Sequence, residues 1–364
     1  MSLAPVSAIR TPPSPRAVEP RARQLPADVE RMLTWLLAGP VRDADGCLKS
    51  WCDDARPGFR YAEATGFLVR VLLDLHQRAG SDELCREARR SARALVSEQH
   101  PSGGFGRDDA LYSFDSGVCL SAWLRLLEIE GGAADAEIPA AAAAAARFLD
   151  AAVRARHAAL RVADGTPIAP ARWSLAFGPH QLKAVHALTR AERLGLARRA
   201  SATALAPTQR IAAAHWHDDH FHWSPSHCAS YAHAHCYALE GLLAHQRDGL
   251  APPRARAMLA AGADWLARVQ SASGAIPSWH GDAAEPPLHP ADATAQAVRI
   301  WVVVDRARHA AAIERALAFL DSLTEPDGGV RYAASRPERS SWATLFAIQA
   351  KLLARLGPSE DPIA

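Results

Sequence analysis

The sequence is poor in cysteine and contains no long apolar run. Six cysteines are few for 364 residues, and several lie in apolar helical patterns where a free thiol behaves as a small hydrophobe, so we expect reduced thiols. No apolar stretch reaches the roughly 20 residues that a membrane-spanning helix needs. The first 24 residues are rich in Pro and Arg and lack the apolar core of a secretory signal. We therefore expect a cytoplasmic protein without a membrane-spanning segment.

An excess of charge of one sign is also missing. The chain has 41 Lys and Arg residues against 39 Asp and Glu residues, which leaves a formal net charge of +2. Binding to nucleic acid or to a membrane surface usually needs a strongly basic face or stretch. We therefore expect no nucleic-acid partner, and a small molecule or a glycan as the ligand.

Strand-like alternation of apolar and polar residues is nearly absent, whereas apolar residues at helical spacing recur throughout the chain. Six segments are apolar around most of their circumference, which predicts buried inner helices: 62–77, 114–130, 179–194, 230–246, 291–304 and 340–356. Six others have one apolar and one polar face, which predicts outer helices: 26–37, 81–98, 138–155, 208–216, 252–270 and 308–323. Outer and inner helices thus alternate in sequence.

The inner segments begin in similar polar heads that repeat every 50 to 63 residues or so, around Glu63, Asp115, Gly178, His235, Asp292 and Trp342. Six such hairpins predict an all-α fold, an (α/α)6 toroid with an inner and an outer ring of helices. We expect one toroid domain over 25–358, a disordered Pro/Arg-rich tail at 1–24 and a short tail at 359–364. An open solenoid is the alternative, because periodicity does not show whether the ring closes.

Several loops and heads resemble the motifs of a known superfamily. Gln99–Phe105, Gln270–Trp279 and Glu325–Gly329 resemble the Gln/Gly/Trp repeats of prenyltransferases and squalene cyclases. Five heads are similar to those of bacterial squalene-cyclase-like repeat proteins associated with surface-polysaccharide gene clusters: Tyr61–Phe67, Phe114–Gly117, Tyr237–Leu243, Asp292–Trp301 and Ser341–Ala350. The resemblance covers roughly residues 50 to 355. It implies an (α/α)6 fold and a role in polysaccharide biosynthesis.

Acidic and His side chains at the heads are candidates for acid–base chemistry. Such chemistry on a sugar needs two proton-handling groups on opposite sides of one bond or one carbon. We predict this role for four residues: Glu63, Asp115, His235 and Asp292. His233 and His235 leave a helix in different directions, so at most one faces a central cavity, and we choose His235. The structural alternative is that each acid caps a helix N-terminus.

Aromatic and polar side chains near the heads are candidates for holding the substrate. Flat apolar rings stack on sugar rings, and an arginine fork binds a carboxylate. We predict substrate contacts for nine residues: Tyr61, Tyr112, Trp173, His180, Tyr231, Tyr237, Trp279, Arg299 and Trp342. The alternatives are ordinary core packing for the rings and a helix-surface charge for the arginine.

A His-rich run between two helices raises the question of a metal. Residues 215–223 contain four His and two Asp side chains, and His227, Cys228 and Cys236 follow. Imidazole, carboxylate and thiolate groups are zinc ligands, but the spacing matches no recognised zinc signature. We therefore expect a polar loop over the mouth, with no metal and no cofactor, and zinc is the alternative.

These observations together predict a carbohydrate-active enzyme, an epimerase, lyase or hydrolase, that works by acid–base chemistry in the mouth of the toroid. A second hypothesis is a terpene-cyclase-like enzyme in which Asp292 donates the proton. Class II terpene cyclases carry Asp-x-Asp-Asp-Thr-Ala, and residues 290–295 keep one of the three carboxylates. A third hypothesis is a non-catalytic toroid that binds a glycan or a partner. The terpene-cyclase hypothesis requires an aromatic cavity without converging polar groups.

Overall fold

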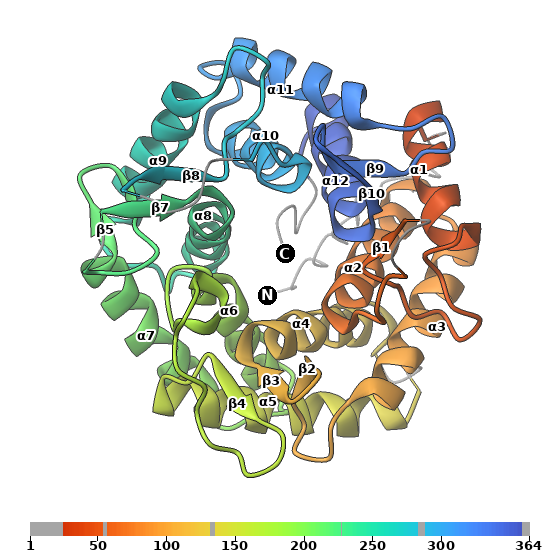
Figure 1. Ribbon diagram of the computed structural model, residues 1–364. Coiled ribbons are helices and arrows are strands. Elements are labelled where there is room, and N and C mark those ends of the chain that lie inside the picture. Colours follow the sequence, from red (N-terminus) through yellow and green to blue (C-terminus); the bar gives the residue numbers. More distant parts are fainter. Residues whose placement is uncertain (1–24, 54–56, 132–134, 227, 283–287, 359–364) are drawn as a thin grey trace, which may run out of the picture.

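The helices form two concentric rings (Figure 1). The structure is a computed structural model that describes residues 25–53, 57–131, 135–226, 228–282 and 288–358. Six helices make the inner ring: α2 (Ala62–Ala79), α4 (Ser113–Glu130), α6 (Gln181–Arg193), α8 (Ala232–Arg247), α10 (Ala291–Asp305) and α12 (Ser341–Leu356). Six make the outer ring: α1 (Ala27–Ala38), α3 (Asp82–Glu98), α5 (Glu137–Ala155), α7 (Ala200–Ala214), α9 (Ala255–Val269) and α11 (Ala310–Leu323). The predicted (α/α)6 toroid is confirmed.

Short strands, which the sequence patterns did not predict, form small antiparallel sheets in the loops between helices. One sheet contains β1 (Trp51–Cys52), β10 (Arg336–Ser340) and β9 (Val330–Ala333), and another contains β2 (Phe105–Arg107), β3 (Ala110–Tyr112) and β4 (Ala159–Arg161). Two further pairs are β5 (Trp216–His217) with β6 (His220–Phe221), and β7 (Ala229–Tyr231) with β8 (Trp279–Gly281). Strands of two to five residues are too short to show a periodic pattern.

The inner ring is closed. Each inner helix packs on the next, and α12 returns to pack on α2. The two ends of the toroid are also joined by backbone pairing, since Trp51 of β1 lies opposite Ser340 of β10. On the outer side, Lys351 and Arg355 of α12 donate to Asp28 of α1 over distances of 2.6 to 2.9 Å. The open solenoid alternative is therefore wrong.

Close helix contacts in the inner ring depend on two glycines. A Cβ at Gly117 of α4 would lie 2.9 Å from the Cα of Ala184 in α6, and a Cβ at Gly241 of α8 would lie 2.3 Å from the carbonyl carbon of Leu182. Distances this short to backbone atoms cannot be relieved by a side-chain rotation. These glycines therefore allow α6 to approach both of its inner neighbours.

The Gln/Gly loops dock onto the outer ring in a repeated manner. Gln99 Nε2 donates to the carbonyls of Gly103 and Ala141, and Gln270 Nε2 donates to those of Gly274 and Ala312. Gly103 and Gly274 both have a φ of +92°, which side chains rarely adopt. Each loop thus fixes an outer helix to the next one along the chain.

The fourth residue of an inner helix sets the position of its head. In α2, the Thr65 hydroxyl accepts the backbone N–H of Leu48 at 2.9 Å and donates to the carbonyl of Tyr61. Ser116 in α4, Thr294 in α10 and Thr344 in α12 make the same pair of hydrogen bonds with the loop before their own helix. This device holds four heads in one register, so that their second residues face the centre.

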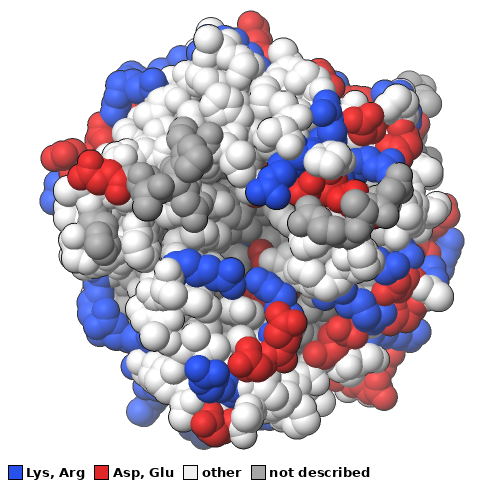
Figure 2. Space-filling model, viewed as in Figure 1, with Lys and Arg blue, Asp and Glu red and all other residues white. Residues whose placement is uncertain are grey.

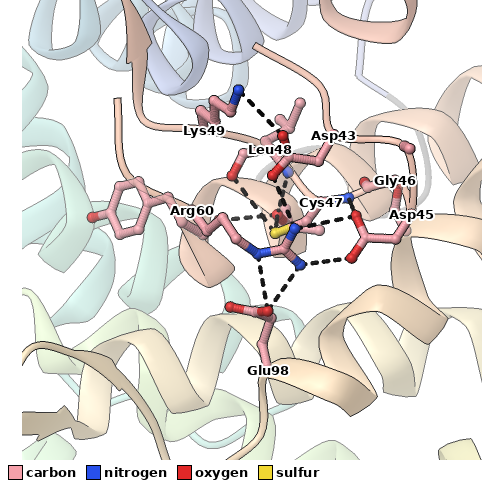
Figure 3. A network of polar contacts seen from close by, with 12 residues as sticks. Asp43, Asp45, Gly46, Cys47, Leu48, Lys49, Arg60 and Glu98 are labelled. Atoms are coloured by element: carbon pink, nitrogen blue, oxygen red, sulfur yellow. Dashed lines mark hydrogen bonds and ion pairs between the residues drawn. The ribbon is translucent and has the colours of Figure 1, made fainter. Parts of the chain in front are cut away.

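An arginine network anchors the head of α2 (Figure 3). Arg60 precedes Tyr61 and donates to Asp43, Asp45 and Glu98 at 2.9, 2.6 and 2.8 Å. The hydrogen bond from Arg60 lowers the pKa of Asp45 below its ordinary value, so the acid stays ionised. The network joins the loop after α1 to the end of α3. It thereby fixes the chain just before Tyr61, where α2 begins.

The outer helix predicted at 208–216 begins eight residues earlier, at Ala200, and Pro207 lies inside it. The proline and the small residues before it obscured the start of the helix, because proline usually marks a helix boundary.

The predicted tails at 1–24 and 359–364 lie outside the described residues. Within the described ranges, no helix has the length and apolar character that crossing a membrane requires.

The hydrogen bonds from Lys351 and Arg355 to Asp28, which join α12 to α1, can be tested by their effect on stability. Burial raises the pKa of Asp28, but hydrogen bonds from Arg355 and Lys351 outweigh it and hold the pKa well below its usual range. We expect Asp28→Asn to lower the free energy of unfolding at neutral pH by about 1–2 kcal/mol, after allowance for solvent screening. Because the folded-state pKa is lowered, the difference from wild type is present above the ordinary value of 3.8 and is lost as the pH falls below it.

Urea unfolding of both proteins at a series of pH values measures this difference. Asp150→Asn is the matched control, since Asp150 pairs only with Arg154 of its own helix α5 in the described structure. If Asp28→Asn lowers the free energy of unfolding no more than the control does, the contacts of Asp28 do not stabilise the closed ring.

Candidate functional site

A pocket opens at the centre of the toroid, on the side where the inner helices begin. It has an empty volume of about 850 Å³, part of which is the open mouth. Figure 2 shows the hollow at the centre of this face, with Lys and Arg side chains on its rim. Its lining consists of Tyr61, Glu63, Arg107, Tyr112, Phe114, Asp115, Arg172, Trp173, Ser174, His180, Tyr231, His233, Tyr237, Asp292, Tyr332 and Trp342.

The register of the inner helices explains this lining. The second residue of five inner helices reaches the pocket: Glu63, Phe114, His233, Asp292 and Trp342. Each lies two positions before the fourth residue that is bonded to the preceding loop. Residues far apart in sequence therefore meet around one space.

Glu63 is held by two tyrosines from opposite sides. Tyr61 Oη donates a short hydrogen bond to Glu63 Oε2, and Tyr237 Oη, from α8, lies 3.4 Å from Oε1. Burial raises the pKa of Glu63, although Tyr61, the charge of His233 and the other polar neighbours act in the opposite direction. Tyr237 also packs against Phe114 with ring centroids 4.6 Å apart, which closes the floor of the pocket.

Asp115 is a buried carboxyl beside an arginine. Burial raises the pKa of Asp115 well above its usual range, and the charge of Glu63 raises it further, while Arg107 lowers it. Arg107 Nη1 lies 3.5 Å from Asp115 Oδ2. The acid therefore keeps its proton to a higher pH than an ordinary aspartic acid, a property that suits a proton donor.

Asp292 is paired with an imidazole. Its Oδ1 accepts from the backbone N–H of Ala293 at 2.6 Å, and its Oδ2 accepts from Trp342 Nε1 at 3.1 Å. His233 Nδ1 lies 3.8 Å from the same Oδ2. This distance is longer than a hydrogen bond, so the contact is electrostatic. A nearby carboxylate favours the protonated imidazole, which suits a proton acceptor.

An aromatic wall stands beside these acids. Trp173, in the short 3₁₀ helix η2 (Trp173–Leu175), stacks on Tyr231 with centroids 4.7 Å apart and an interplanar angle of 27°. It meets His180 and His233 edge-on at 5.2 and 5.9 Å. Burial lowers the pKa of His180 to about 3, so that imidazole is neutral. The wall offers a flat apolar surface with polar edges, which suits a sugar ring.

The structure brings together most of the residues predicted for the site. Three of the four predicted catalytic residues line the pocket, namely Glu63, Asp115 and Asp292, and seven of the nine predicted substrate-contact residues do so: Tyr61, Tyr112, Trp173, His180, Tyr231, Tyr237 and Trp342. Their roles remain predictions. Three predicted residues do not line it: His235, Trp279 and Arg299.

The choice of His235 over His233 is wrong, because His235 occupies the structural fourth position of α8. Its Nδ1 accepts the backbone N–H of Phe221 at 3.1 Å, as the hydroxyls of the other heads do, and its Nε2 lies 3.3 Å from the carbonyl of Gly262 in α9. The ring is fully buried against Trp265. Burial lowers the pKa of His235 to about 3, and the imidazole is neutral.

Arg299 and Trp279 lie outside the pocket for different reasons. Arg299 is fully buried below it, where Nη2 lies 3.2 Å from Glu240 Oε1 and the guanidinium stands over the ring of Phe346. The side chain lies two helical turns below the head of α10, which is too deep for the mouth. Trp279 of β8 supports the wall from behind, with its ring 4.7 Å from Tyr231.

Several pocket residues were not among those predicted for the site. Aligning the inner segments on their fourth residue would have placed His233 level with Glu63 and Asp292. Arg107 and Tyr332 come from the strand loops, whose pairing no periodic pattern revealed. Arg172 lies in the loop between β4 and η2, and folding alone brings that loop over the mouth.

The His-rich run has structural contacts of its own. His220 stacks on Trp265 with centroids 4.4 Å apart, and His215 Nδ1 lies 3.1 Å from the carbonyl of His222. Among the described residues, no three His, Cys, Asp or Glu side chains are grouped so that they could hold a metal. His227 lies outside the described residues. The zinc alternative finds no assembled ligand set in the part of the chain that is described.

Solved structures similar to this chain share the toroid. The cellobiose 2-epimerase of Spirochaeta thermophila DSM 6192 matches with a TM-score of 0.69 and 13% identity, over 90% of this chain and 96% of its own. The cellobiose 2-epimerase of Bacillus thermoamylovorans B4167 matches with a TM-score of 0.67 and 10% identity, over 88% and 98%. An unsaturated glucuronyl hydrolase specific for heparin matches with a TM-score of 0.65 and 13% identity, over 90% and 95%.

At this level of identity the likeness establishes the fold alone. No protein-family model and no curated protein matches the chain. The resemblance to squalene-cyclase-like repeat proteins is therefore supported only in its fold.

His233 and His235, at the start of α8, lead to different predictions for stability. His235→Ala removes the acceptor of the Phe221 N–H and leaves a cavity, so we expect it to lower the free energy of unfolding by about 2–4 kcal/mol. His233→Ala should cost less stability, because His233 borders the open pocket. Chemical unfolding of both variants compares them. A larger loss for His233→Ala would contradict the assignment of His235 as the structural residue.

Proposed function

We propose that this protein is a carbohydrate-active enzyme that moves protons on a sugar bound in the central pocket. The observation that carries the proposal is the meeting of Glu63, Asp115 and Asp292, from three different inner helices, beside an aromatic wall. Burying a carboxyl costs free energy, so three of them around one pocket favour a functional role. Two carboxyls in different environments have different pKa values, so one can act as the acid and the other as the base. The solved toroids with a similar fold include two sugar epimerases and a glucuronyl hydrolase.

Asp115 is the proposed general acid. It is buried, its pKa is raised, and it faces the pocket from α4. In a hydrolysis it gives its proton to the oxygen that leaves the sugar, and in an epimerisation it gives the proton to the carbon from the new face. Glu63 lines the same pocket, and burial raises its pKa as well.

The Asp292 and His233 pair is the proposed base. Asp292 is fixed by Trp342 and the Ala293 amide, and its carboxylate, 3.8 Å from His233 Nδ1, stabilises the imidazolium that forms when His233 accepts a proton. In an epimerisation the proton comes from the carbon next to the carbonyl of the open sugar. In a hydrolysis it comes from the attacking water. The same two groups serve either reaction, so the substrate decides between them.

The pocket composition argues against the terpene-cyclase alternative. That hypothesis required a cavity lined chiefly by aromatic residues and without converging polar groups, whereas this pocket contains three carboxyls, two arginines and two histidines. The non-catalytic alternative is decided by the assay below. The association with polysaccharide biosynthesis and the cytoplasmic location stay predictions.

Turnover of a panel of reducing disaccharides and oligosaccharides tests the proposal. Epimerisation in heavy water places solvent deuterium on carbon, hydrolysis creates new reducing ends, and elimination creates an unsaturated uronate. We expect Asp115→Asn to lower kcat/KM by about 10²- to 10⁴-fold through loss of the general acid. Asp150→Asn, on the outer surface, is the matched control. Absence of turnover on every sugar, with tight binding retained, would favour the non-catalytic toroid.

The raised pKa of Asp115 also predicts a pH dependence. A general acid must be protonated, so activity should fall as the pH rises through the raised pKa of this group. Burial disfavours the ionised form in the folded protein, so stability should fall in the same direction. The loss of stability should begin above the ordinary value of 3.8 and end at the raised pKa. Asp115→Asn resembles the protonated acid and should remove that loss. A loss of the same size in wild type and variant would exclude Asp115 as its source.

A further inference from the structure

Two arginines face the pocket from loops that lie outside the inner helices. Arg107 belongs to β2, and Arg172 immediately precedes the 3₁₀ helix η2 that carries Trp173. Neither belongs to the repeated heads. The repeat of the inner helices therefore does not explain why these two arginines line the pocket.

Arg107 is held in place by aromatic rings. Its guanidinium carbon lies 4.9 Å from the ring centroid of Tyr112 and 5.4 Å from those of Phe59 and Tyr61. Cation–π contacts of this kind orient the guanidinium. Its carboxyl neighbour at 3.5 Å is Asp115, whose pKa is raised by burial. Arg107 thus keeps a positive charge at a defined place on the wall.

The carboxyls of the pocket do not balance the arginines. Both Glu63 and Asp115 have raised pKa values, because burial disfavours their ionised forms. When these two acids hold their protons, Asp292 is the one carboxylate in the pocket lining that faces Arg107 and Arg172. The pocket then has a net positive charge, which favours a ligand with a negative group.

Arg172 is an exposed residue at the mouth of the pocket. The residue is adjacent in sequence to Trp173, whose ring stacks on Tyr231 and makes T-shaped contacts with His180 and His233. A sugar ring that lies against this wall has its substituents within reach of the neighbouring side chain. A guanidinium presents two parallel N–H groups, which match the two oxygens of a carboxylate.

We propose that the sugar in this pocket is an acidic one, a uronic acid residue whose carboxylate is bound by Arg172 while Arg107 supplies a second positive charge. This inference rests on the proposed function, since it names the class of sugar that the site takes. It assigns specificity to Arg172, whose side chain touches the substituent of the ring and takes no part in proton transfer.

A matched pair of ligands tests the inference. A disaccharide ending in glucuronic acid and its neutral glucose counterpart with the same linkage differ only in the carboxylate. We expect wild type to bind the acidic member roughly 10- to 100-fold more tightly, as a hydrogen-bonded ion pair provides. Arg172→Gln should remove most of this preference and leave the dissociation constant of the neutral member unchanged. Titration calorimetry measures all four constants without the need for turnover.

The control is Arg161→Gln, which removes an exposed arginine of β4 that pairs with Asp109 at 3.4 Å. Its ligand preference should equal that of wild type. Equal affinity for both disaccharides in wild type would overturn the inference while leaving acid–base turnover of neutral sugars possible. Tighter binding of a sulfated or phosphorylated analogue than of the uronate would overturn the assignment to a carboxylate. If no sugar is turned over, the proposed function fails, and the ligand preference still decides the inference.

Discussion

A hydrogen bond between the fourth residue of an inner helix and the loop before it is the constraint on which the site depends. The backbone N–H groups of Leu48, Phe105, Phe221, Ile276 and Val330 find their acceptors in this way. A buried N–H without an acceptor is costly, so the register of each head is strongly specified. Once the register is set, the second residue of each of these five helices faces the centre. The site is thus a consequence of satisfying the loop backbone.

The shared register brings the heads together only because the ring is closed. Heads on an open superhelix would face a long groove, whereas heads on a closed ring face one space. The contact of α12 with α2 and the pairing of β1 with β10 complete the ring. Tyr237 then reaches Glu63 from α8, and Trp342 reaches Asp292 from α12. The polar contacts of the pocket therefore join helices that are distant in the sequence.

The sequence predicted the helices well because their signals are local. Inner and outer segments differ in how much of their circumference is apolar, and this pattern identified all twelve helices of the described residues. The acids at Glu63, Asp115 and Asp292 were found because they recur at the starts of inner segments. The start of α7 was missed because Pro207 interrupts the local pattern. His233 and His235 were confused because helical geometry separates their directions without saying which one points inward.

By itself, the sequence determined the alternation of buried and amphipathic helices, the repeat and the placement of acids and aromatic residues at the helix starts. These features follow from apolar periodicity and composition, which act over a few turns of chain. Only the tertiary structure decided that the ring closes, that His233 and not His235 faces the pocket, and that Arg107 and Arg172 reach it from the loops. Each of these depends on contacts between segments far apart in the chain, for which local patterns carry no signal.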